Sequence, residues 1–106
     1  MAEVTEIVNT IDRLDRELTE LVLRGLRAVG PQHLTALQSL GDEFARIGAV
    51  HLAERITTLV GAIQADDRKS AEALLRTQTS LRVFERLLTV RTTLAQFASM
   101  TQENAE

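Results

Sequence analysis

The sequence predicts an all-α protein, an antiparallel up-down-up-down four-helix bundle with long first and last helices and two short middle helices. Apolar residues recur at alternating steps of three and four along most of the chain, which is the period of a helix. No alternating apolar and polar run bounded by turn residues indicates a strand. The connections are short, which favours antiparallel neighbours. With 106 residues and 44% apolar content, the chain is sized for one domain, 1–106, with a single core.

The first predicted helix begins near Val4 and carries one apolar stripe. Its members are Val4, Ile7, Ile11, Leu14, Leu18, Leu21, Val22, Leu26 and Val29. Charged residues fill most of the remaining positions, and we interpret them as a solvated face. Gly30-Pro31 is predicted to end this segment, because proline disfavours a helical residue before it and is favoured in a first helical turn.

The second predicted helix begins at Pro31 and ends at Gly48. Its apolar positions are Leu34, Leu37, Leu40, Phe44 and Ile47. Gly48 follows the last of them and suits a left-handed C-cap, which predicts a joint between two helices at Gly48-Ala49. Gly41 lies inside the helix, where glycine costs about 1 kcal/mol relative to alanine. We therefore expect a neighbouring helix to approach closely there.

The third predicted helix carries Leu52, Ile56, Leu59, Val60 and Ile63. Asp66 and Asp67 are predicted to cap the last helix, whose pattern runs from Arg68 almost to the C-terminus. The last residues, 101–106, are expected to fray.

The last predicted helix has more apolar surface than one packing contact needs. One stripe consists of Leu74, Leu81, Phe84 and Leu88. A second stripe, turned by roughly a third of a revolution, consists of Val83, Leu87, Val90, Leu94 and Phe97. Either both stripes enter one core, or the second reaches beyond the short middle helices and forms an interface with a second copy or a partner helix. The second stripe is the candidate interface.

Composition argues against several classes of partner. The net charge is -3, both signs are interleaved, and the three phenylalanines all lie on apolar stripes, so no nucleic acid is expected. No apolar run approaches the roughly 18 residues that cross a bilayer, so no membrane is expected. The acidic, amphipathic N-terminus is unlike a signal peptide, and cysteine is absent. These features predict a cytoplasmic protein.

No pattern of residues indicates catalysis or a cofactor. The sequence has no GxSxG, no phosphate-binding glycine loop and no HExxH, so we expect no enzyme, no catalytic residue and no cofactor-binding residue. His51 and Glu54 are three residues apart and share a helix face, but no second such pair completes a carboxylate-histidine metal site. We interpret them as surface residues and expect no metal.

The stretch LQSLGDEFARIGAVHLAE resembles part of a histidine phosphotransfer (HPt) domain, a family of helical bundles of similar length. The matching positions are Leu40, Ile47, Gly48, Ala49 and Leu52. Gln38 stands at the position of the phospho-accepting histidine, and glutamine cannot carry a phosphoryl group as a phosphoramidate. Gly41, Asp42 and Glu43 replace the lysine, glycine and small residue of the motif. The resemblance implies a relative used for docking, with Gln38, Asp42 and Glu43 as the candidate docking surface.

Three hypotheses for function follow. The first is a small non-catalytic protein-protein interaction module that forms a homodimer or docks on a larger partner through the last helix. The second is a phosphotransfer-like signalling domain without its histidine. The third is a ligand- or metal-binding helical bundle.

Overall fold

The computed structural model describes residues 2–66 and 68–105, with side chains for 5–26, 28–66 and 68–100. These residues form four α-helices and a short 3₁₀-helix, with no strand among them. In chain order they are α1 (Ala2–Arg24), η1 (Leu26–Ala28), α2 (Pro31–Ile47), α3 (Val50–Gln64) and α4 (Ser70–Ala105). The predicted all-α class with four helices is confirmed.

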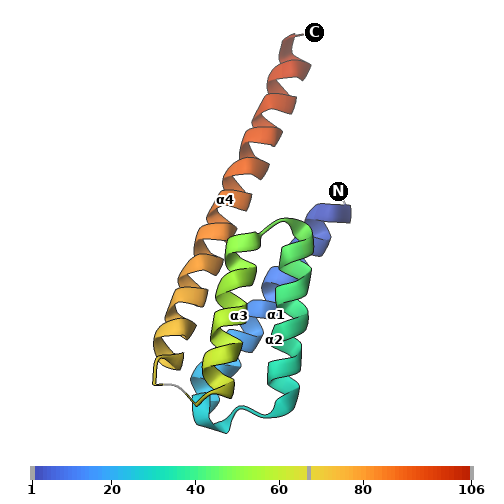
Figure 1. Ribbon diagram of the computed structural model, residues 1–106. Helices are drawn as coiled ribbons and strands as arrows, with labels where there is room; N and C mark the ends of the chain where they lie inside the picture. Colours follow the sequence, from blue (N-terminus) through green and yellow to red (C-terminus); the bar gives the residue numbers. More distant parts are fainter. Residues whose placement is uncertain (1, 67, 106) are drawn as a thin grey trace.

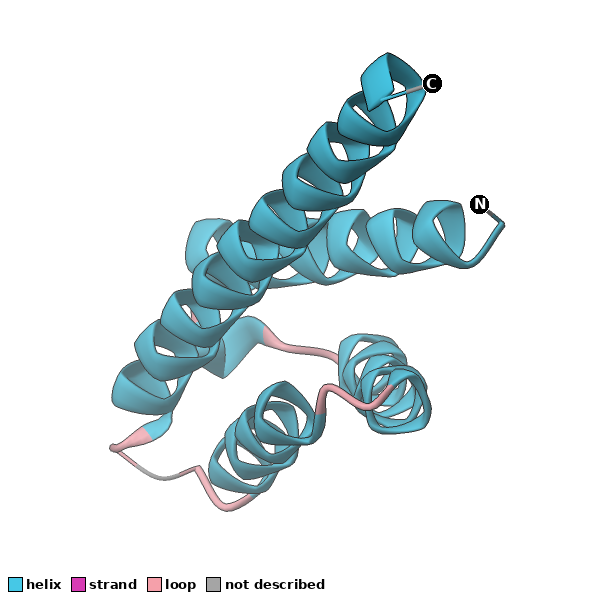
Figure 2. Cartoon of the chain, turned by 90° about the horizontal axis from the view of Figure 1, so that it is seen from above, coloured by secondary structure: helices cyan, strands magenta, loops and turns pink. Residues whose placement is uncertain are grey.

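Figure 1 follows the chain down α1, up α2, down α3 and up α4. Seen from above, α2 and α3 are viewed almost along their axes, while α1 and α4 are seen from the side and cross each other (Figure 2). α4 has 36 residues and α3 only 15, so α4 continues beyond the turn that joins α2 to α3. The structure is therefore elongated, with extents of 61 × 22 × 22 Å.

The first helix is shorter than its apolar stripe predicts. α1 ends at Arg24, because Gly25 adopts a φ of 84°, a value that side chains rarely allow. The Gly25 N–H still donates to the Leu21 carbonyl at 2.9 Å, and the chain then turns through η1. Leu26 and Val29 pack against the core from outside α1. The prediction of one helix through Val29 is wrong because apolar spacing continued across a backbone break.

The joint between α2 and α3 has the predicted geometry. Gly48 has φ 100° and ψ 2°, the left-handed conformation of a helix C-cap. Its N–H lies 3.1 Å from the carbonyl oxygens of both Phe44 and Ala45, and the Ala49 N–H donates to Phe44 at 2.9 Å. These bonds satisfy carbonyls at the end of α2, so the chain reverses without leaving them unpaired.

Gly41 is buried where α2 faces α3, as a close approach requires. A Cβ built on Gly41 would nevertheless lie 3.4 Å from Ile56 Cγ2 and 4.0 Å from the Ala53 carbonyl oxygen, which are ordinary van der Waals contacts. The space between the two helices therefore accommodates a methyl group, and steric exclusion of a side chain does not explain the glycine.

Alanine at the two glycines of this region is expected to act in opposite directions. Gly41→Ala should raise the free energy of unfolding by up to about 1 kcal/mol, because it removes the conformational freedom of glycine from a helix interior. Gly48→Ala should lower it by about 1 kcal/mol, because alanine is strained at positive φ. Urea unfolding followed by circular dichroism compares the two variants with the wild type, and a less stable Gly41→Ala would contradict the contact geometry.

α4 begins two residues later than the sequence predicts. Its first residue is Ser70, and the Ala73 N–H donates to the Lys69 carbonyl at 2.9 Å in the first turn. Asp66 has a φ of 50° and lies four residues before the helix, so it is not the N-cap. Asp67, the other predicted cap, lies outside the described residues. The tail predicted to fray, 101–106, also falls on residues whose side chains are outside the described part.

The core takes side chains from all four α-helices. Its buried members are Ile11, Leu14, Leu18, Leu21, Leu37, Leu40, Phe44, Leu52, Ala53, Ile56, Leu59, Val60, Ala73, Leu74 and Leu81. Phe44 and Phe84 meet edge to face, with ring centroids 5.9 Å apart and an interplanar angle of 87°. The buried Thr77 hydroxyl lies 2.8 Å from the Ala73 carbonyl oxygen and 3.2 Å from that of Arg55, which links α4 to α3. These contacts hold the first half of α4 against the bundle.

Candidate interaction surface

The two apolar stripes of α4 have different surroundings. In the first stripe Leu74 and Leu81 are buried, and Phe84 and Leu88 are half-buried against the core. The five residues of the second stripe are between 51% and 68% exposed. The structure therefore leaves the second stripe outside the core, and the interpretation that both stripes enter it is wrong. We call Val83, Leu87, Val90, Leu94 and Phe97 the α4 seam.

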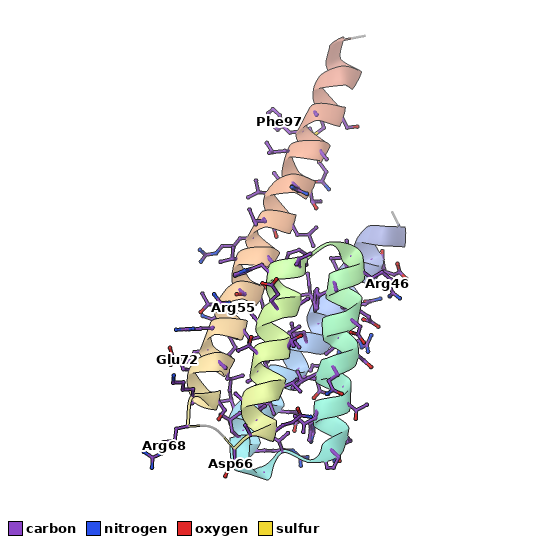
Figure 3. All side chains as sticks on the ribbon, viewed as in Figure 1. Arg46, Arg55, Asp66, Arg68, Glu72 and Phe97 are labelled. Atoms are coloured by element: carbon purple, nitrogen blue, oxygen red, sulfur yellow. The ribbon has the colours of Figure 1, made fainter. Side chains whose placement is uncertain are left out.

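The seam is exposed for two reasons: its first residues lie on a different face of α4 from the core-packed Phe84 and Leu88, and its last residues lie where α4 extends beyond the other helices. After Leu88, Thr92 is half-buried, and every other side chain up to Met100 is exposed. Figure 3 shows Phe97 projecting from the part of α4 that has passed the α2–α3 turn. Two more exposed large side chains, Leu75 and Met100, lie on α4 before and after the seam. The exposed apolar surface therefore follows most of the length of this helix.

The spacing of the seam is that of a coiled coil. Its residues follow one another at steps of four, three, four and three, so that Leu87 and Leu94 occupy a positions of a heptad, and Val83, Val90 and Phe97 occupy d positions. At a rise of about 1.5 Å per residue, the seam is roughly 21 Å long. A period of 3.5 residues keeps such a row facing one partner helix along its whole length.

Arginines flank the seam on both sides. Arg86 occupies a g position and Arg91 an e position, and both are exposed. From 82 to 100 the sequence holds three arginines and one glutamate, Glu85. Glu85 is half-buried and lies about 200° around the helix from Leu87, on the far side from the seam. The borders of the apolar row are consequently positive, although the whole chain is negative.

A groove adjoins the seam where α4 leaves the bundle. It has a volume of about 450 Å³. Its lining residues come from the α2–α3 turn, from α4 and from α1: Ile7, Ile47, Gly48, Ala49, Val50, His51, Phe84, Leu87, Leu88 and Arg91. Leu87 belongs to both the groove and the seam, so the two surfaces are continuous.

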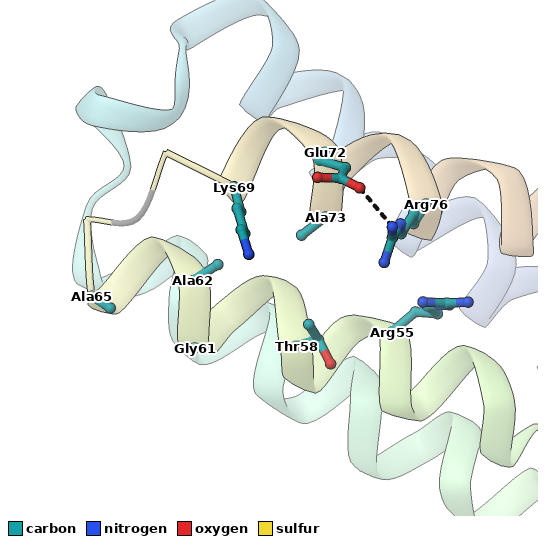
Figure 4. A pocket seen from close by; sticks show the side chains of 9 residues that line it. All are labelled: Arg55, Thr58, Gly61, Ala62, Ala65, Lys69, Glu72, Ala73 and Arg76. Atoms are coloured by element: carbon teal, nitrogen blue, oxygen red, sulfur yellow. Dashed lines mark hydrogen bonds and ion pairs between the residues drawn. The ribbon is translucent and has the colours of Figure 1, made fainter.

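A second groove lies between α3 and the first half of α4 (Figure 4). It has a volume of about 290 Å³, and it is lined by the small residues Gly61, Ala62, Ala65 and Ala73, by Thr58, and by the charged residues Arg55, Lys69, Glu72 and Arg76. A neighbouring hollow shares Arg55, Glu72 and Arg76 and reaches Val83, the first residue of the seam. The cationic lining therefore continues up to the seam.

The two arginines of this second groove differ in their pairing. Glu72 accepts a hydrogen bond from Arg76 Nη2 at 2.6 Å, a pair in which both side chains are more than half exposed. Arg55 Nε is shielded from solvent and has no acceptor in the described part of the chain. Arg76 is therefore paired with a carboxylate, whereas Arg55 forms no ion pair among the described residues.

The residues of the HPt-like docking surface do not share one environment. Gln38 and Asp42 are exposed and lie one turn apart on α2. Glu43 is half-buried, and both of its carboxylate oxygens lie 3.1 Å from Arg13 Nη1 of α1. Glu43 thus joins two helices of the bundle, while Gln38 and Asp42 face outward; their role in docking stays a prediction.

The two histidines also differ. His33 is mostly buried, with its Nδ1 3.4 Å from Glu17 Oε2 of α1, and its Nε2 has no partner in the described residues. His51 and Glu54 are both exposed on α3. Across the described residues, no group of three or more His, Cys, Asp or Glu side chains is arranged to hold a metal ion.

Comparisons of the chain with protein-family models, curated proteins and solved structures found no match. Among the described helices, none has both the length and the apolar character needed to cross a membrane. Among the residues whose side chains are described, most of the exposed large apolar ones lie on α4, and five of them form the seam.

Apolar spacing predicts the residues of the seam but not the charged residues that border it. Arg86 and Arg91 were detectable, because they stand one residue before and four residues after Leu87, which are flanking positions of a heptad. The grooves were not detectable, because they depend on where the α2–α3 turn lies relative to α4.

Proposed function

We propose that this protein is a small non-catalytic interaction module, an antiparallel four-helix bundle that presents the α4 seam to a second copy of itself or to a larger protein. The observation that carries the proposal is a row of five large apolar side chains, each more than half exposed. They lie on a helix that extends beyond the rest of the bundle. The proposal assigns the chain no reaction and no cofactor.

The exposed apolar surface of the seam supplies a driving force for association. Fully burying one large aliphatic or aromatic side chain contributes about 1.5–3 kcal/mol, so five of them on one line are a substantial driving force for association. A contiguous exposed apolar patch is typical of an interaction site, whereas single exposed apolar residues are common on any protein surface. The heptad spacing supports a helix as the surface that covers it.

The test is sedimentation velocity of the whole chain from low micromolar to near-millimolar concentration, alone and with helical peptides that carry apolar heptads. The proposal expects either a mass that rises above 11.7 kDa with concentration, or a monomer that binds such a peptide. A chain that stays monomeric and binds no such peptide would overturn it.

A further inference from the structure

We propose that the occupant of the α4 seam is a helix of another protein that has its own apolar heptads and carries carboxylates on both flanks. This inference rests on the proposed function and specifies the partner. It chooses a partner of opposite charge over a second copy of this chain, and the choice follows from the borders of the seam.

The borders disfavour self-pairing. In a parallel pair of helices, a g position of one chain lies beside the following e position of the other. Arg86 of each copy would therefore lie beside Arg91 of the other, so two like-charged contacts would form in one dimer. In an antiparallel pair the arginines have different neighbours. The two segments are still both positive, because each holds three arginines and one glutamate over 82–100. A helix with carboxylates at its flanks turns both arginines into attractive partners.

The grooves next to the seam also carry positively charged side chains, as its borders do. Arg91 lines the groove beside the α2–α3 turn, so a carboxylate on that side of the incoming helix would meet it within a partly enclosed space. Toward the beginning of α4, Arg55 and Arg76 line the hollow that reaches Val83. The carboxylate of that hollow, Glu72, is already bonded to Arg76, and Arg55 forms no ion pair among the described residues. Cations thus accompany the seam from Val83 to beyond Val90.

The test uses two synthetic helical peptides of about four heptads. Both have the same leucine and isoleucine residues at their a and d positions. One peptide has glutamate at every e and g position, and the other has lysine. Fluorescence anisotropy measures the Kd of each for the whole chain at low and high salt. The acidic peptide is expected to bind about tenfold more tightly, since two attractive pairs replace two repulsive ones. The difference should shrink as salt screens the charges.

Two variants make the test specific. Arg86→Glu with Arg91→Glu should reverse the preference, so that the lysine peptide binds more tightly. Arg16→Glu with Arg68→Glu is the matched control, because it changes the net charge equally at exposed positions remote from the seam. The control should keep the preference for the acidic peptide.

Each outcome separates the inference from the proposed function. Equal binding of both peptides, or a preference unaltered by the Arg86 and Arg91 changes, overturns the acidic partner and leaves the seam as an interface. Self-association that excludes both peptides identifies a second copy as the occupant and also overturns the inference. If Val90→Gln with Leu94→Gln binds the acidic peptide as well as the wild type does, the seam is not the binding site and the proposed function fails.

Discussion

Replacing Phe44 by alanine is expected to lower the free energy of unfolding by about 3–5 kcal/mol, the cost of removing a fully buried phenylalanine side chain and leaving a cavity. Phe44 is 0% exposed in the middle of the core, and its ring is packed edge to face on Phe84 of α4. Because a domain of this size has a total stability of only about 5–15 kcal/mol, the loss is a large fraction of the whole. We expect the Tm to fall by roughly 10–30 °C.

Thermal and urea unfolding followed by circular dichroism measure this effect. The matched control is Phe97→Ala, which removes the same atoms from a side chain that is 68% exposed. Phe97→Ala should leave the free energy of unfolding within about 0.5 kcal/mol of the wild type at concentrations where the chain is monomeric. A Phe44→Ala variant as stable as Phe97→Ala would show that the core is not organised around Phe44.

Replacing Val90 and Leu94 together by glutamine is expected to abolish association through α4 while preserving the fold. The two side chains are 54% and 63% exposed, so their replacement removes no core contact. Burying each in an interface would contribute about 1.5–3 kcal/mol, so losing both should weaken binding by more than about a hundredfold. Glutamine has a helix propensity close to that of leucine, which keeps α4 helical.

Sedimentation velocity of each variant, alone and with the acidic peptide, reports the association, and far-ultraviolet circular dichroism reports the helix content. Thr89→Gln with Ala95→Gln is the matched control, because it places two glutamines at exposed positions of α4 outside the seam. The control should associate like the wild type. Undiminished association of the Val90 and Leu94 variant would assign the interface to another surface of the molecule.

The sequence predicted the helices well where local chemistry decides them. Pro31 starts α2 and Gly48 ends it, since each acts through its own backbone preference and needs no distant contact. The end of α1 was missed, because Gly25 broke the helix while Leu26 and Val29 kept the spacing of the stripe. The start of α4 was placed too early, because an aspartate can occupy a turn as well as a cap.

Part of the candidate site could be predicted, because it too depends on the local order of residues. Heptad spacing is a property of the order of residues, so the seam from Val83 to Phe97 can be recognised in the sequence alone. The spacing does not tell whether a stripe is covered. Leu87 and Leu88 are neighbours of identical type, yet Leu88 packs against the core and Leu87 is 58% exposed.

The sequence by itself determined that this protein is built of helices, where α2 meets α3, and that the last helix has two apolar stripes. These properties depend on backbone preference and on a period of 3.6 residues, both of which are local. Only the tertiary structure decided which stripe is buried and that arginines and a groove border the other one. Burial depends on which face of α4 the neighbouring helices cover and on how far those helices reach, and α2 and α3 end at their turn while α4 continues past it.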